Sequence, residues 1–149
     1  MEFLEFFKTE NKEYWLSQIS KSDWVAGQYL ACLLRENKLF DLVGENSRVL
    51  MLTDGENLIS FCTLAKFDDV QPTVLTPWIG FVHTFPEYRG KRLSGDLLGF
   101  AEKLAKQDGA TNVYISTNHI GLYEKYGYEF FTEAKDVEGE DTRVYRKKI

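Results

Sequence analysis

The chain lacks the features that mark several protein classes. It has only 2 cysteines and 3 prolines in 149 residues, which excludes a disulfide-stabilised scaffold and a proline-rich fibre. No apolar run approaches the ~18 residues of a membrane-spanning helix, and the N-terminus is acidic where a secretory signal is basic. Basic residues are outnumbered, 18 against 23 acidic ones, for a net charge of −5. A broad nucleic-acid-binding face is therefore not expected, and we predict a cytoplasmic protein without membrane or nucleic-acid partners.

The two cysteines also give no sign of a metal site. Cys32 and Cys62 each lie inside an apolar stretch, away from other potential ligands at metal-binding spacing. We interpret both as small buried hydrophobic residues. No metal is predicted.

What the sequence does contain is enough apolar material for one core. Hydrophobic residues make up 44% and aromatic residues 15% of the chain, and the length fits a single domain over residues 1–149. Helical spacing predicts two short helices before about Asn37. Residues 49–53 and 58–64 are predicted to form an antiparallel hairpin, and a third strand is predicted over about 73–83, regular from Trp78.

The second half alternates between helix and strand patterns. Apolar residues fall on one helical stripe after residue 92: Leu93, Leu97, Leu98, Ala101, Leu104 and Ala105. A strand over 112–116, a helix of about two turns over 120–126 and strands near 128–132 and 143–146 complete the pattern. The order strand, long helix, strand predicts a parallel pair with a right-handed crossover inside a mixed α+β fold.

The turn before the long helix concentrates positive charge in an acidic protein. Arg89, Gly90, Lys91 and Arg92 precede the predicted helix N-terminus, where unpaired backbone N–H groups and the helix dipole favour anions. This pattern is typical of a phosphate-binding site. A solvated basic turn is the alternative reading from spacing alone.

Two segments resemble the GNAT superfamily of N-acetyltransferases. Residues 81–94, Phe-Val-His-Thr-Phe-Pro-Glu-Tyr-Arg-Gly-Lys-Arg-Leu-Ser, resemble its acyl-CoA-binding core, and residues 118–128, Asn-His-Ile-Gly-Leu-Tyr-Glu-Lys-Tyr-Gly-Tyr, resemble its second signature. The resemblance implies a mostly antiparallel sheet flanked by helices, whose central parallel pair splays to hold coenzyme A (CoA). It also makes a homodimer a reasonable expectation.

The resemblance further implies which residues hold the co-substrate, acetyl-CoA. The cofactor-binding residues it implies are Val82, His83, Thr84, Arg89, Gly90, Lys91, Arg92, Leu93, Ser94 and Asn118. Arg92 and Ser94 stand where the family has small residues. The sequence leaves open whether Arg92 crowds the backbone's approach to the diphosphate or pairs with it.

The reaction implied is transfer of an acetyl group from acetyl-CoA to a primary amine, on a small molecule or peptide, by direct attack in a ternary complex. Tyr123 matches the family tyrosine that protonates the leaving thiolate. His83 is proposed as a catalytic base, with His119 as a second candidate, because an ordinary histidine titrates near neutral pH. Two groups of acidic residues either attract a cationic amine or belong to solvated charged loops: Asp68 and Asp69, and Glu138, Glu140 and Asp141. A non-catalytic acyl-CoA-binding sensor with the same fold is the alternative function.

Overall fold

The computed structural model describes residues 1–149, and its centre is one seven-stranded sheet with the strand order β1-β2-β3-β4-β5-β7-β6. The strands are β1 (Glu2–Glu5), β2 (Arg48–Asp54), β3 (Asn57–Ala65), β4 (Trp78–Thr84), β5 (Asn112–Thr117), β6 (Glu129–Lys135) and β7 (Asp141–Lys148). The helices are α1 (Lys12–Ser20), α2 (Val25–Arg35), α3 (Leu39–Val43) and α4 (Leu93–Gln107). Short 3₁₀ turns are η1 (Phe6–Lys8), η2 (Pro86–Tyr88) and η3 (Glu124–Tyr126). Every strand pair is antiparallel except β4–β5, which confirms the predicted fold class.

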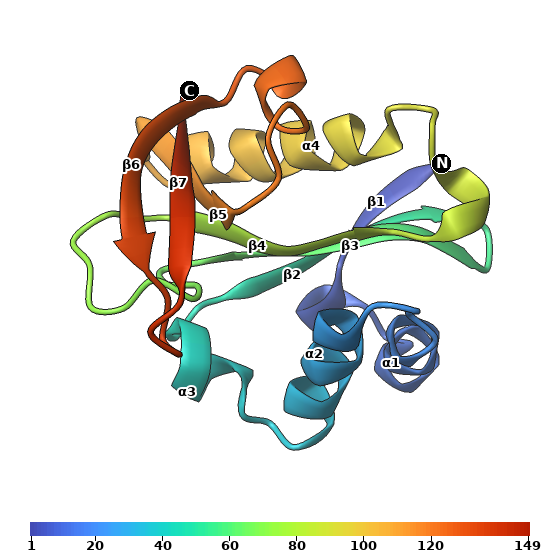
Figure 1. The fold of residues 1–149 in the computed structure, drawn as a ribbon. Coiled ribbons are helices and arrows are strands. Elements are labelled where there is room, and N and C mark those ends of the chain that lie inside the picture. The colour runs from blue at the N-terminus through green and yellow to red at the C-terminus, as the bar shows by residue number, and fades with distance from the viewer.

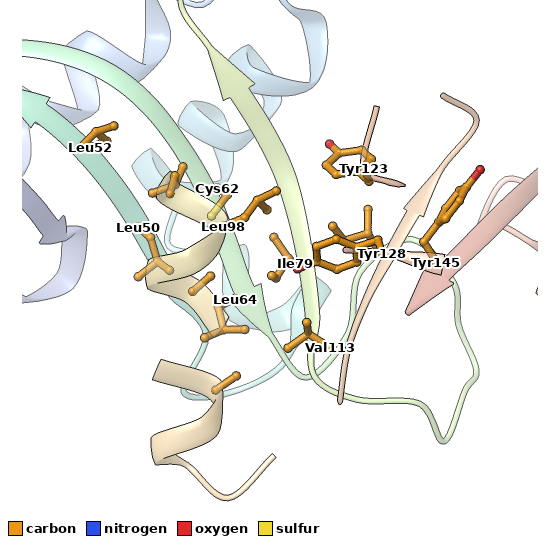
Figure 2. Close-up of a cluster of buried hydrophobic side chains, with 14 of the residues drawn as sticks. Leu50, Leu52, Cys62, Leu64, Ile79, Leu98, Val113, Tyr123, Tyr128 and Tyr145 are labelled. Carbon is orange, nitrogen blue, oxygen red and sulfur yellow. The ribbon is translucent and has the colours of Figure 1, made fainter. Parts of the chain in front are cut away.

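Helices cover both faces of the sheet: α4 lies on one face and α1, α2 and α3 lie on the other (Figure 1). Strand β3 is buried from Leu58 onward because its side chains enter two cores in turn. Ile59 and Leu64 pack with α4 in one apolar cluster (Figure 2), whereas Phe61 and Ala65 pack with α1 and α2 in another. No helix is long and apolar enough to cross a membrane.

Most predicted elements are confirmed, with four differences. The two early helices, the hairpin, β4, α4, β5 and the last two strands all form. Strand β1 and helix α3 were not predicted, because each is only four or five residues long. The helix predicted over 120–126 is wrong: Gly121 has φ of +90° and only the single turn η3 forms. The predicted burial of Cys32 is also wrong, since its side chain is exposed whereas Cys62 is buried.

The parallel pair β4–β5 separates almost as soon as it begins. Its only register pair joins Trp78 to Tyr114, near the N-terminal end of each strand. Beyond that point β5 pairs with β7 along its full length, so the backbone edge of β4 that faces β5 is left without a strand partner.

Strand β4 also carries a β-bulge on its other side. His83 pairs with Phe61 and Gly80 pairs with Thr63, so three residue steps on β4 match two on β3. Phe81 takes a left-handed conformation there, with φ of +51°. A bulge re-aims backbone and side chains locally and is frequent beside active sites, and this one lies on the strand whose opposite edge is left unpaired.

Candidate functional site

A cavity of about 1090 Å³ occupies the space between the separated ends of β4 and β5. Its walls come from β4, the 88–94 turn, the end of β5 and residues 119–126, together with the α1–α2 connection and the loop after β3. The separation predicted from the resemblance is therefore present as an open slot. A volume of this size accommodates an extended ligand rather than a single small ion.

The turn that enters α4 forms a cradle of backbone donors. Gly90 has φ of +81° and Arg92 has φ of +60°, and no protein acceptor receives the N–H groups of Gly90, Lys91 and Arg92. They lie at the N-terminus of a 15-residue helix, where the helix dipole adds partial positive charge. The geometry thus matches the anion-binding reading of the sequence.

The structure shows how Arg92 is accommodated at a position where a small residue was expected. Its backbone is left-handed, a conformation that costs a non-glycine residue about 1 kcal/mol. Its guanidinium lies over the Tyr126 ring, 5.8 Å from the ring centroid, and the side chain lines the cavity. Tyr126 in turn lies within 3.4 Å of the Ser94 hydroxyl. Arg92 therefore stands beside the cradle rather than across it.

Arg89 is held by the protein itself. Its Nε donates a hydrogen bond to the Thr84 carbonyl oxygen at 2.8 Å, and its guanidinium lies 3.4 Å from Asp23 Oδ1 in the α1–α2 connection. Arg89 thus ties the end of β4 to the opposite wall of the cavity.

Nine of the predicted site residues meet around this cavity, and two do not. Those lining it are Val82, His83, Thr84, Arg89, Gly90, Arg92, Leu93, Ser94 and Tyr123. Lys91 belongs to the turn, but its side chain is exposed and does not line the cavity. Asn118 also lies off the cavity, and its amide donates to the Asp141 carbonyl oxygen at 3.3 Å. His119 is exposed at the rim.

Tyr123 lies at the border between the core and the cavity. Only 7% of it is exposed, and its ring packs edge-on against Tyr128 at 6.2 Å between centroids. Figure 2 shows its hydroxyl oxygen pointing away from Tyr128, and no protein group accepts a hydrogen bond from that hydroxyl. Burial raises the Tyr123 pKa, with smaller contributions from Cys62, Asp68 and Tyr126. The phenol is therefore a protonated donor at neutral pH.

His83 is buried in an aromatic box at the end of β4. Its ring stacks on Trp24 and contacts Phe61 and Phe85. The Nε2 atom makes no hydrogen bond, and Asp23 Oδ1 lies 3.5 Å away. Burial lowers the His83 pKa, partly opposed by Asp23 and reinforced by Arg89, so the imidazole is neutral at pH 7.

The structure departs from the solvated-loop reading for Asp68 and Asp69, which are both partly buried and line the cavity. Burial raises the pKa of Asp68 to about 7, and the neighbouring Asp69 carboxylate adds to the rise. The Asp69 Oδ1 atom is buried without a hydrogen-bond partner. Gly80 was the available sequence signal, since a glycine inside a strand marks close approach by another group.

No group of three or more His, Cys, Asp or Glu side chains is placed to hold a metal ion. The groups that surround the cavity are instead hydrogen-bond donors, cations, a phenol, an imidazole and two carboxylates. That set suits binding of an anionic carrier and management of protons.

Comparisons with known proteins agree with this description. The model of the acetyltransferase (GNAT) family matches residues 5–128. No curated protein sequence matches the chain. Among solved structures, an acyl-CoA N-acyltransferase from Pseudomonas aeruginosa is 25% identical, with a TM-score of 0.66 over 98% of this chain and 97% of that one.

Two further structures share the fold at lower identity. The aminoglycoside 6'-N-acetyltransferase from Enterococcus faecium is 13% identical, with a TM-score of 0.71 over 99% of this chain and 97% of that one. An aminoglycoside 6'-N-acetyltransferase complexed with coenzyme A is 14% identical, with a TM-score of 0.72 over the same shares of the two chains. Because the family model covers most of the sequence, the chain belongs to the GNAT family of acetyltransferases.

Proposed function

We propose that this protein transfers an acetyl group from acetyl-CoA to a primary amine by direct attack within a ternary complex. The observation that carries the proposal is the open slot between β4 and β5, which begins beside a turn of unpaired N–H donors. Catalysis of this kind depends on holding the two reactants in line and on stabilising charge as it develops.

The diphosphate of the carrier would lie on the turn. The N–H groups of Gly90, Lys91 and Arg92 make no protein hydrogen bonds and supply oriented donors, followed by Leu93 and Ser94 at the start of α4. Arg92 and Lys91 add positive charge there, and charge-assisted hydrogen bonds to phosphate are about twice as strong as neutral ones.

The pantetheine arm would follow the unpaired edge of β4 from Thr84 back to Val82. Phe81 and Val82 also lack register partners on β3 because of the bulge. Backbone donors at this point would polarise the thioester carbonyl and stabilise the oxyanion that forms when the amine attacks.

Tyr123 would stabilise the departing sulfur. An ordinary tyrosine has a pKa near 10 and an ordinary thiol one near 8.5, and burial raises the Tyr123 pKa further. Complete proton transfer from this phenol to a thiolate is therefore unfavourable. The phenol instead donates a hydrogen bond to the developing negative charge, and the proton that finally resides on sulfur comes from the attacking amine.

The fold neighbours that acetylate aminoglycosides, together with the acidic residues on the cavity wall, support a small-molecule amine as acceptor. A homodimer stays a prediction, which analytical ultracentrifugation tests.

Binding is tested by thermal melting with and without coenzyme A. We expect saturating coenzyme A to raise the melting temperature, because a ligand that binds only the folded state stabilises it. Arg92→Ala should reduce that rise by removing a cation beside the cradle. Lys103→Ala is the control, because it removes an exposed cation from the middle of the same helix. An unchanged melting temperature in the wild type would contradict the proposal.

Turnover is tested by thiol release from acetyl-CoA with a panel of primary amines. Tyr123→Phe should lower kcat by about 10²-fold, which is the lower end of the range for removing one hydrogen-bond donor to developing negative charge. Tyr114→Phe is the matched control, because Tyr114 is also buried on this sheet but lies off the cavity. Coenzyme A binding without thiol release on any amine would indicate the non-catalytic sensor instead.

A further inference from the structure

The cavity has two chemically different ends. Arg92 and Lys125 line it near the N-terminus of α4. At the other end, Asp68 and Asp69 line it from the β3–β4 loop, and Glu138 lines it from the adjacent β6–β7 loop. The first end suits the anionic carrier. The second end is suited to a cation, and the positively charged reactant in this chemistry is the protonated acceptor amine.

Asp68 is built into this second end through contact with β4. A Cβ atom on Gly80 would overlap the Asp68 carboxylate, so the carboxylate rests directly against the backbone of the strand. Gly80 immediately precedes Phe81 at the bulge. The carboxylate therefore lies beside the backbone that we assign to the thioester carbonyl.

Two further polar atoms in the same cavity are buried without a hydrogen-bond partner. His83 has only 4% of its side chain exposed, and its Nε2 makes no hydrogen bond. The Asp69 Oδ1 atom is likewise buried and unpartnered. Buried polar groups are ordinarily paired, and an ammonium carries three donors and no acceptor. A bound ammonium would thus supply the donor that the Asp69 oxygen lacks.

Resting on the proposed function, we propose that Asp68 binds the ammonium of a cationic acceptor and removes its proton. The ammonium N–H bond breaks, its proton moves to the Asp68 carboxylate, and the freed lone pair attacks the thioester carbon. The C–N bond then forms and the C–S bond breaks, with the electron pair leaving on sulfur. The second proton of the amine passes to sulfur, giving an amide and a thiol, and Asp68 returns its proton to solvent.

The surroundings of Asp68 make it a stronger base than an ordinary carboxylate. Burial and the charge of Asp69 raise its pKa to about 7. Burial also raises the pKa of Asp69, and the charge of Asp136 adds to that rise. The Asp68 charge in turn adds to the rise in the Tyr123 pKa that burial causes, and Glu138 lines the same end of the cavity as Asp68. For a lysine-like amine with a pKa of ~10.4, the equilibrium constant for proton transfer to an ordinary carboxylate is about 10⁻⁶. For the Asp68 carboxylate it is about 10⁻³.

His83 is less suited to that task. Its pKa is lowered by burial, and a protonated imidazole there would lie near the Arg89 cation. As a neutral ring it can still accept a hydrogen bond from the ammonium through the ring nitrogen that carries no proton. We therefore assign His83 to positioning of the amine and Asp68 to its deprotonation.

The test compares Asp68→Asn with the wild type on two kinds of primary amine. One probe, spermidine, is fully protonated at pH 7, and the other, trifluoroethylamine, is largely neutral at that pH. Asp68→Asn should lower kcat/KM for spermidine by at least 10²-fold and remove the fall in wild-type rate below about pH 7. The loss for trifluoroethylamine should be less than tenfold, because that amine has little need of a base.

Further variants separate a catalytic role from a structural one. Gly80→Ala keeps the carboxylate but displaces it, so it should reproduce the spermidine loss, and the double variant should be no worse than either single one. Asp41→Asn, the same change at an exposed site on α3, should match the wild type. A stabilising effect of coenzyme A that is retained in Asp68→Asn shows that the variant is folded.

The outcomes distinguish this inference from the proposed function. Thiol release by the wild type with an unchanged pH profile in Asp68→Asn, or an equal loss on both amines, overturns the role of Asp68 and leaves the acetyltransferase proposal intact. Absence of thiol release by the wild type with every amine of the panel overturns the proposed function and this inference with it.

Discussion

Replacing Asp68 by asparagine should make the protein more stable at pH 8. The pKa of Asp68 rises from 3.8 to about 7 in the folded protein, chiefly through burial. Each pKa unit corresponds to 1.36 kcal/mol, so the ionised carboxylate costs the folded state at most about 4 kcal/mol. The residue keeps some contact with solvent, which reduces this to about 2 kcal/mol. Asparagine has nearly the same shape and carries no charge, so it should recover most of that free energy.

The sign of the pH dependence follows from proton binding. Between about pH 4 and 7 the folded protein holds a proton on Asp68 that the unfolded chain has released. The free energy of unfolding therefore falls as pH rises through this window and stays low above it. The advantage of Asp68→Asn should be largest at pH 8, smaller at pH 5 and absent below about pH 4.

Thermal melting from pH 4 to 8 measures this effect. For a chain of this length, a gain of about 2 kcal/mol corresponds to a rise of roughly 4 to 8 °C in Tm. Asp41→Asn should leave the melting temperature unchanged across the series, because Asp41 is exposed. A lower melting temperature for Asp68→Asn at pH 8, or a gain independent of pH, would show that the carboxylate is not buried as described.

Two other substitutions test the packing around the site. Arg92→Gly should raise the Tm of the ligand-free protein by a few degrees, because glycine adopts the left-handed conformation at φ of +60° without a cost of about 1 kcal/mol; a fall in Tm would contradict that conformation. Glu102→Ala should lower the free energy of unfolding by about 2 to 3 kcal/mol in urea titrations. Its carboxylate accepts hydrogen bonds from the Tyr128 hydroxyl and the Lys147 ammonium, each at 2.8 Å, and both would be left unpaired. A loss below about 0.5 kcal/mol, as is typical of an exposed residue, would refute the role of this linkage between α4 and the last strands.

Local sequence patterns predicted those elements whose burial repeats along the chain. The α4 stripe recurs along the helix because Leu97, Leu98, Ala101 and Ala105 all face one cluster, and the β2–β3 hairpin follows from two apolar runs on either side of a tight turn. Helix α3 is too short for a period to appear. Near Gly121 a helical pattern failed because one glycine takes a left-handed conformation.

The two ends of the candidate site also differ in how well local sequence predicts them. The cationic turn is contiguous in sequence and adjoins a well-predicted helix, so its anion-binding character is visible from residues 89–92 alone. The acidic end is not, because it depends on how closely Asp68 approaches Gly80 across a loop of irregular structure. The raised pKa of the carboxylate follows from that tertiary contact and has no local pattern in the chain.

The placement of Asp68 and Tyr123 also links the two proton movements of the proposed reaction. The negative charge of Asp68 contributes to the raised pKa of Tyr123, so the phenol is a weaker acid while the base is ionised. Binding of the protonated amine offsets that charge, and the pair stays neutral when the proton moves to Asp68, so the phenol is a better hydrogen-bond donor once the acceptor is bound. The change therefore comes before negative charge develops on the leaving sulfur. Binding of a cationic acceptor thus strengthens stabilisation of the leaving group through electrostatics alone, with no movement of the backbone required.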